Sequence, residues 1–246
     1  MEVCRMRRTP VIIFVNKLDR EGRDPFEILD ELEAELKIGV RPLSWPINIG
    51  AHFKGVYNIY ENTLDLFTPN KQKISERVEI TDVNDPAVDT AVGPVDAAKL
   101  REDLVLIQGV YPDFDRELYL AGQMAPVFFG SALNTFGVKE LLDCFVKIAP
   151  SPRPVVTAES ITVKPEDPDF SGFVFKIHAN MDPNHRSCIA FVKVCSGVFL
   201  RNHNYKQMRT GKIMKFAAPT AFMAQKKSIV DEAYPGDIVG IPDTGN

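Results

Sequence analysis

Residues 9–39 contain the feature that most constrains the fold, a strand, a polar loop and a helix in direct succession. The run from Val11 to Val15 is apolar at every position, which is typical of a parallel strand covered on both faces. The tetrad Asn16-Lys17-Leu18-Asp19 follows it at once. Asp24-Pro25-Phe26-Glu27 then predicts a helix start, with Asp24 as cap and Glu27 closing a capping box. This succession is the unit of an open α/β sheet, where ligands bind beyond the carboxyl ends of the strands.

A second strand and loop of the same kind occur much later in the chain. The apolar run from Ala125 to Phe129 leads into Gly130-Ser131-Ala132-Leu133-Asn134. A helix is predicted over residues 138–148, and its inward positions are expected to be Leu141, Leu142, Phe145 and Ile148. Because parallel strands end at the same rim of a sheet, the two loops are expected to approach one ligand from two sides.

Residues 42–123 interrupt this pattern and are acidic, so they are interpreted as an inserted α+β subdomain. Short strands are predicted within residues 45–49, 53–60, 63–67 and 77–80, and helices over 96–107 and 114–121. The surrounding α/β domain is then formed by residues 1–41 and 124–150. The first helix of that domain carries Ile28, Leu29, Leu32 and Leu36 at helical spacing, and Gly39 is predicted to end it.

A proline-rich segment begins at Ala149, and residues 151–167 are predicted to be a linker. Beyond it the hydrophobic period becomes two, with Phe173, Phe175 and Ile177 alternating with other residues in a strand over 172–178. Another strand is predicted over 189–195, and turn signals recur. Residues 168–246 are therefore predicted to form a small all-β barrel after the α/β part.

The net charge of −4 is unevenly distributed. No Asp or Glu occurs between Pro183 and Val230, which leaves −13 for the rest of the chain. This span carries nine cations: Arg186, Lys193, Arg201, Lys206, Arg209, Lys212, Lys215, Lys226 and Lys227. The asymmetry indicates either a polyanionic partner or a solvated basic face.

The remaining composition excludes several classes of protein. The apolar runs are far shorter than the roughly 20 residues that a membrane span needs, so no membrane partner is expected. The four cysteines show no CxxC pairing and are interpreted as reduced, in a cytoplasmic protein. The scattered histidines have no metal-ligand spacing, so no metal site is expected within the chain.

The tetrad has the chemistry to recognise guanine. An ionised carboxylate only accepts hydrogen bonds, and Asp19 can accept two from the adjacent N1–H and amine of guanine. Adenine lacks that donor pair, and a site built on such bonds rejects the analogue by a factor of about 10⁴ or more. Asn16 can bond the base edge or tie neighbouring loops together. The apolar stem of Lys17 can lie along the face of the base.

Asn16-Lys17-Leu18-Asp19 and Ser131-Ala132-Leu133 resemble the two guanine-recognition motifs of the translational GTPases. Residues 42–123 resemble the insert that these factors carry between the motifs. Within this superfamily, similarity to the bacterial peptide-chain release factor 3 family rests on FVNKLDREGRDPFEILDELE, LSWPINIGAHFKGVYNIY and FSGFVFKIHANMDPNHRSCIAFVKVCSG. Elongation factor G is similar through FKGVY and the second domain, but lacks the ANMDPNHR-type hairpin.

The resemblance implies a role for each motif residue. Asp19 would read the guanine donors, Asn16 would bond the base edge and Lys17 would cover the ring. Ser131 would brace its loop, and the backbone N–H of Ala132 would donate to guanine O6, beside Leu133. The family uses GTP with Mg²⁺ on the ribosome to recycle class I release factors in translation termination. The basic second domain would then face ribosomal RNA, through Arg186, Lys193, Arg201, Lys206, Arg209, Lys212 and Lys215.

The chain departs from the family in one large respect, because it contains no G-x-x-x-x-G-K-[ST] and no switch segments. The expectation is therefore an internal fragment that holds no catalytic residue, does not hydrolyse GTP alone and binds no cofactor. Its opening strand would lack neighbouring strands, so we expect it either to recruit a partner, such as a second copy of the chain through the partial sheet, or to leave an apolar face exposed. Two alternatives stay open: a translocation GTPase like elongation factor G, and a non-enzymatic ribosome- or RNA-binding module with a relic guanine site.

Overall fold

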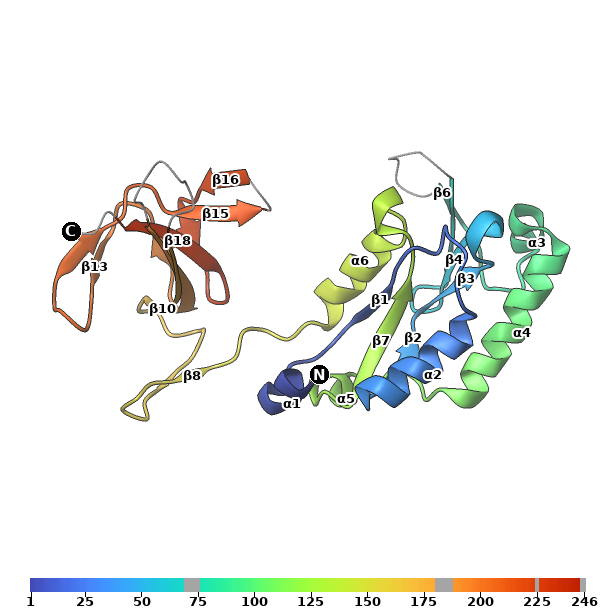
Figure 1. The fold of residues 1–246 in the computed structure, drawn as a ribbon, viewed down its shortest axis with the longest axis horizontal. Coiled ribbons are helices and arrows are strands. Elements are labelled where there is room, and N and C mark those ends of the chain that lie inside the picture. Colours follow the sequence, from blue (N-terminus) through green and yellow to red (C-terminus); the bar gives the residue numbers. More distant parts are fainter. Residues whose placement is uncertain (69–75, 180–187, 224–225, 244–246) are drawn as a thin grey trace. The chain divides into compact units, whose positions relative to one another are not determined.

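A computed structural model describes residues 1–68, 76–179, 188–223 and 226–243. The chain divides into two compact units, Met1–Pro150 and Ser151–Asn246. The first unit mixes helices and strands, and the second consists of β-strands, as the sequence predicts (Figure 1).

The centre of the first unit is a parallel sheet in the order β1-β7-β2. Its strands are β1 (Ile13–Val15), β7 (Met124–Phe129) and β2 (Gly39–Pro42). Ile13 pairs with Val127 and Val15 with Phe129, so β1 and β7 run in parallel and end together. This pairing places the loops after both strands at one rim of the sheet, as predicted.

Helices cover both faces of this sheet (Figure 1). Phe14 and Phe128 point toward α6 (Val138–Ile148) and α5 (Arg116–Leu120). Val15 and Phe129 point the other way, toward α2 (Pro25–Leu36) and the strands that follow it. Alternate residues of each strand thus enter separate cores, which explains why both strands are apolar throughout.

Residues 42–123 form an antiparallel meander with helices on it. Its strands follow the chain in order: β3 (Ser44–Ile47), β4 (Gly55–Asn58), β5 (Thr63–Leu66) and β6 (Glu76–Val78). Helices α3 (Pro86–Val92) and α4 (Pro94–Val110) follow the meander in the chain, and α5 then leads into β7. Trp45, Val56 and Ile107 join Val127 and Phe129 in one buried cluster, so this block shares its core with the parallel sheet. The division into domain and insert stays a prediction.

Some elements differ from their predicted form. Asp24 caps α2 by accepting from the backbone of Phe26. The helix ends at Leu36 and its C-cap is Lys37 in a left-handed conformation, so Gly39 already begins β2. The sequence pattern also missed α1 (Glu2–Arg7) and α3. In α6, Leu142 and Phe145 are exposed rather than inward, because Cys144 and Glu140 occupy the buried face beside Ile148.

The second unit contains a five-stranded sheet in the order β10-β11-β18-β15-β16. These strands are β10 (Ser171–Ala179), β11 (Cys188–Ser196), β18 (Ile238–Asp243), β15 (Thr220–Met223) and β16 (Lys226–Ile229). Shorter ladders join β12 (Phe199–Leu200) to β17 (Glu232–Ala233) and β13 (Asn204–Lys206) to β14 (Ile213–Lys215). The predicted linker also holds a small hairpin of β8 (Val155–Val156) and β9 (Thr162–Val163).

The edge strand β10 is solvated along nearly its whole length. Every residue from Gly172 to Ala179 is exposed, including Phe173, Phe175 and Ile177. A bulge interrupts its pairing with β11 between Val174 and Lys176. No pairing among the described residues joins β10 to β16, so closure of this sheet into a barrel stays a prediction.

Candidate functional site

The loops after β1 and β7 are fastened to each other where the two strands end. The backbone N–H of Gly130 donates to Val15 O at 3.0 Å, and the N–H of Leu18 donates to Gly130 O at 3.1 Å. These bonds continue the strand pairing into the tetrad and into the Ser131 loop. The structure therefore brings the two predicted motifs together.

Asn16 makes the side-chain link between these loops. Its Oδ1 accepts from the backbone N–H of Ala132 at 2.9 Å and from the N–H of Lys17 at 2.8 Å. The sequence left two roles open for Asn16, bonding the base edge or linking neighbouring loops. In the structure its side chain links the two loops. The carbonyl oxygen of this amide is engaged, so its Nδ2 is the group left to donate to a ligand.

Asp19, Lys17 and Leu133 lie at the open side of the rim. Lys17 has a left-handed backbone (φ 70°), and both it and Leu133 are exposed. Asp19 is half-buried, and no described residue donates a hydrogen bond or forms an ion pair with its carboxylate. A carboxylate at this rim with no partner among the described residues can accept two parallel donors from a base.

Ser131 is hydrogen-bonded within its own loop. Its backbone exchanges two hydrogen bonds with Phe136, each at 3.0 Å. Its buried hydroxyl accepts from Asn134 Nδ2 at 2.8 Å. The loop that presents Ala132 is therefore held at both ends.

Three further residues position these loops, and sequence reasoning had not assigned them a role. Leu18 is buried in the main core, and its carbonyl accepts from Gly50 N at 2.8 Å, which connects the tetrad to residues 42–123. A Cβ on Gly130 would lie 2.3 Å from Phe136 O, and one on Gly137 would lie 2.5 Å from Phe129 O. The signals available were an apolar residue within a polar tetrad and two glycines flanking the loop.

We expect Gly130→Ala to lower the free energy of unfolding by about 1–3 kcal/mol, because the added methyl group meets backbone that must move. Gly109→Ala is a matched control, since Gly109 lies in α4 and a Cβ there meets nothing within 4 Å. The control should stabilise by about 0.5–1 kcal/mol through helix propensity. Urea unfolding of both variants measures the difference, and equal shifts of the same sign would contradict the tight approach.

The predicted RNA-facing cations gather partly on one hairpin. In the β13–β14 ladder Lys206 pairs with Ile213 and Asn204 with Lys215, so Lys206 and Lys215 share a face. Tyr205, on the other face, packs with Phe199 and turns that side toward the core. Arg209 and Lys212 lie in the connecting turn, and all four cations are exposed. The hairpin is orange in Figure 1, at the label β13.

The other predicted cations lie elsewhere. Arg201 donates to Ala217 O at 2.7 Å and forms an ion pair with Asp231 at 3.2 Å. Its guanidinium is therefore already bound within the second unit. Lys193 is exposed on β11, in a different sheet from the hairpin. Arg186, like most of the ANMDPNHR segment, lies outside the described residues.

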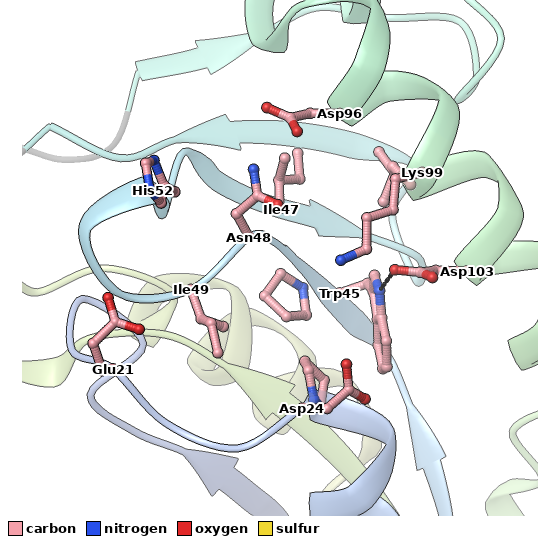
Figure 2. A pocket seen from close by; sticks show the side chains of 13 residues that line it. Glu21, Asp24, Trp45, Ile47, Asn48, Ile49, His52, Asp96, Lys99 and Asp103 are labelled. Atoms are coloured by element: carbon pink, nitrogen blue, oxygen red, sulfur yellow. Dashed lines mark hydrogen bonds between the residues drawn. The ribbon is translucent and has the colours of Figure 1, made fainter.

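A cavity of about 280 Å³ is lined in part by Glu21 and Asp24, which follow the tetrad in the sequence (Figure 2). None of the predicted guanine-binding residues lines it. Its floor includes Trp45 and Ile47, and carboxylates of Asp24, Asp96 and Asp103 surround it. Trp45 Nε1 donates to Asp103 Oδ2 at 2.9 Å. This cavity is therefore distinct from the rim that holds Asp19.

Asp103 gives a spectroscopic prediction. Burial raises the pKa of its carboxyl, and the Trp45 hydrogen bond only partly offsets this. The folded protein therefore binds this proton more readily than the unfolded chain, and the stability that protonation contributes is lost as pH rises through the raised pKa. Since Trp45 is the only tryptophan in the sequence, its fluorescence should titrate with a midpoint above the ordinary pKa of an aspartate. Asp103→Asn should abolish this transition. Asp24→Asn should keep it but lower its midpoint, because the charge of Asp24 also raises the pKa of Asp103. A transition unchanged in Asp103→Asn would contradict the assignment.

The rim residues have the donors and acceptors that a guanine base needs, and the described part of the chain holds no cluster of metal ligands. Asp19, Lys17 and the Asn16 amide could hold the base. The sequence has no phosphate-loop motif, and no three His, Cys, Asp or Glu side chains in the described ranges could hold a metal ion. No helix in the same ranges is long and apolar enough to cross a membrane.

A parallel sheet with two linked loops at one rim, followed by a β-rich unit, defines an α/β domain of the nucleotide-binding GTPase type with a second β domain. Residues 1–151 match the elongation factor Tu GTP-binding domain, and residues 169–246 match elongation factor G domain 2. The first match covers more than half of the chain, so the chain belongs to the elongation factor Tu GTP-binding domain family, the translational GTPases.

A solved structure has the same fold. The crystal structure of ttk003000868 from Thermus thermophilus matches with a TM-score of 0.64 and 18% sequence identity. The match covers 98% of this chain and 35% of that protein. The chain therefore spans about a third of the length of the protein that it resembles.

Proposed function

We propose that this chain is the base-recognising and ribosome-facing part of a bacterial peptide-chain release factor 3. In this proposal the intact protein that carries the chain uses GTP to release class I release factors from the ribosome, in the cytoplasm. The observation that carries it is the joined rim, where Asn16 ties Ala132 to the tetrad and leaves the Asp19 carboxylate free. Three stretches of sequence similar to that family favour it over other translational GTPases.

The base would be held by three groups of the rim. Asp19 would accept from guanine N1–H and the amine, and Asn16 Nδ2 would donate to an acceptor on the base edge. Lys17 would lie along the ring through its apolar stem. The N–H of Ala132 already donates to Asn16, so it would reach guanine O6 only by sharing its hydrogen or after a small shift of the loop.

The phosphates and Mg²⁺ would be held by segments that this sequence does not contain, since phosphoryl transfer depends on the residues that position them. The isolated 246-residue chain should therefore show no GTP hydrolysis and no calorimetrically detectable binding of GDP at micromolar concentrations. Binding near micromolar would mean that another segment of this chain cradles the phosphates, and the assignment of the chemistry would be wrong.

The test of the function is the ejection of a fluorescent class I release factor from ribosomal termination complexes by the intact protein. GTP-dependent acceleration of ejection, without movement of transfer RNA, supports the proposal. GTP-dependent transfer-RNA movement instead would support the alternative, a translocation factor like elongation factor G, which the match of residues 169–246 favours. Ribosome binding with neither activity would indicate the non-enzymatic binding module.

A further inference from the structure

Two buried carboxylates meet one arginine where residues 42–123 contact α6. Asp65 on β5 is 1% exposed and Glu140 on α6 is 2% exposed. Arg77 on β6 lies between them, with Nε 3.1 Å from Asp65 Oδ1 and Nη2 3.5 Å from Glu140 Oε1. The second oxygens, Asp65 Oδ2 and Glu140 Oε2, are buried and have no hydrogen-bond partner in the described part of the chain. Among the described residues, Arg77 is the only cation that forms an ion pair with either carboxylate.

Glu140 lies close to the loop that presents Ala132. Helix α6 begins at Val138, directly after Gly137. The preceding residue, Phe136, pairs with Ser131 and so closes the loop. The Phe136 ring also contacts the rings of Phe53 and Phe67, at 5.5 and 5.4 Å. The first turn of α6, which contains Glu140, is therefore the direct continuation of the loop.

We propose that Arg77 is a positioning residue for the loop of residues 131–136, because it holds the first turn of α6 against β5 and β6 through Asp65 and Glu140. The function of that loop in base recognition rests on the proposed function above. The geometry makes the strands of residues 42–123 part of the support of the guanine site, in addition to the contact between Gly50 and Leu18.

Removal of the guanidinium would leave two buried charges without a cation, which strongly destabilises a packed contact. Burial already raises the pKa of both carboxyls, and the charge of Asp65 raises the pKa of Glu140 further. Lys139 and Glu61 also act on this pair, but Lys139 is paired with Asp143 and Glu61 with Lys147. Without Arg77, α6 would move away from the strands at high pH, and proton uptake would relieve the repulsion at low pH.

The experiment is amide hydrogen exchange on the 246-residue chain, in the wild type and in Arg77→Met. Exchange at residues 131–136 should accelerate by about tenfold or more above about pH 7, after correction for intrinsic rates, and the difference should shrink at acidic pH. Arg101→Met is the matched control, since Arg101 pairs with Asp89 in the same block, at 2.6 Å, without touching α6. Its exchange at 131–136 should equal that of the wild type.

A further variant keeps the proposal testable if Arg77→Met does not fold. Arg77→Met with Asp65→Asn and Glu140→Gln removes both buried charges and should restore slow exchange of the loop. Unchanged loop exchange in Arg77→Met, or acceleration that is equal throughout β3 and β4, would overturn the inference. Hydrogen exchange needs no nucleotide, so it tests the role of Arg77 independently of the proposed function. If the proposed function is wrong, the variants will change the exchange of the loop without changing the GDP affinity of the intact protein.

Discussion

Asp19→Asn is expected to change the preference of the intact protein from GDP to xanthosine diphosphate. Xanthine carries a carbonyl oxygen where guanine has its amine, so an amide N–H can donate to it while the amide oxygen accepts from N1–H. With GDP, the N–H of the new asparagine would point at the amine of guanine. Both groups are donors, so one of them would be left without a hydrogen-bond partner. Discrimination by such mismatched hydrogen bonds reaches about 10⁴. Competition of the two nucleotides for a fluorescent analogue measures both affinities.

Asp24→Asn is the matched control for this substitution. Asp24 lies in the same loop and undergoes the same chemical change, but its carboxylate caps α2, a role that asparagine also fills. The control should keep both the nucleotide preference and the melting temperature. If Asp19→Asn kept the preference for GDP as well, Asp19 would have to be removed from the base site.

Replacing Lys206, Arg209, Lys212 and Lys215 with glutamine is expected to give the largest loss of ribosome affinity. These side chains project from one exposed hairpin, where each is free to contact a phosphate. Each lost phosphate contact should lower the slope of log affinity against log salt by about 0.7–0.9, or by about 3 in total. Sedimentation of the chain with ribosomes at several salt concentrations measures the slope.

The control for the hairpin variant removes equal charge from other exposed positions. Lys37, Lys99, Arg116 and Lys164 are all exposed and lie outside the hairpin. Their replacement should lower ribosome affinity only through the change in net charge. The slope of log affinity against log salt should stay close to that of the wild type. Equal effects of the two variants would mean that a diffuse field, rather than the hairpin, holds the polyanion.

The rim of the parallel sheet could be predicted from the sequence because its signals are local. An apolar run, a polar tetrad and a capped helix follow one another within residues 11–36, and α6 forms over the predicted residues. Parallel strands must end together, so the meeting of the tetrad with the Ser131 loop followed from topology alone. The hydrogen bond between Asn16 and Ala132 could not be predicted from the sequence, because the Asn16 amide could bond either the base or the neighbouring loop.

The burial of Glu140 could not be predicted, because its partner is distant in sequence. Helical periodicity favours leucine and phenylalanine for the inward face of α6, and a glutamate among them is normally assigned to solvent. Only the pairing of β5 with β6 places Arg77 beside it. The same reasoning applies to β10, whose alternating pattern indicates a strand but says nothing of what covers it.

The order of strands in the first unit also has a consequence for how the chain folds. In the meander β3-β4-β5-β6, each strand pairs with the next strand along the chain. Strand β1 instead pairs with β7, and all of residues 42–123 lie between these two strands in the sequence. Local contacts form early, and loop closure over long segments is slow because of its entropy. The meander should therefore collapse first and carry β7 back to β1. The rim with Asp19 and Ala132 should then be completed only when β7 pairs with β1, after the meander has formed.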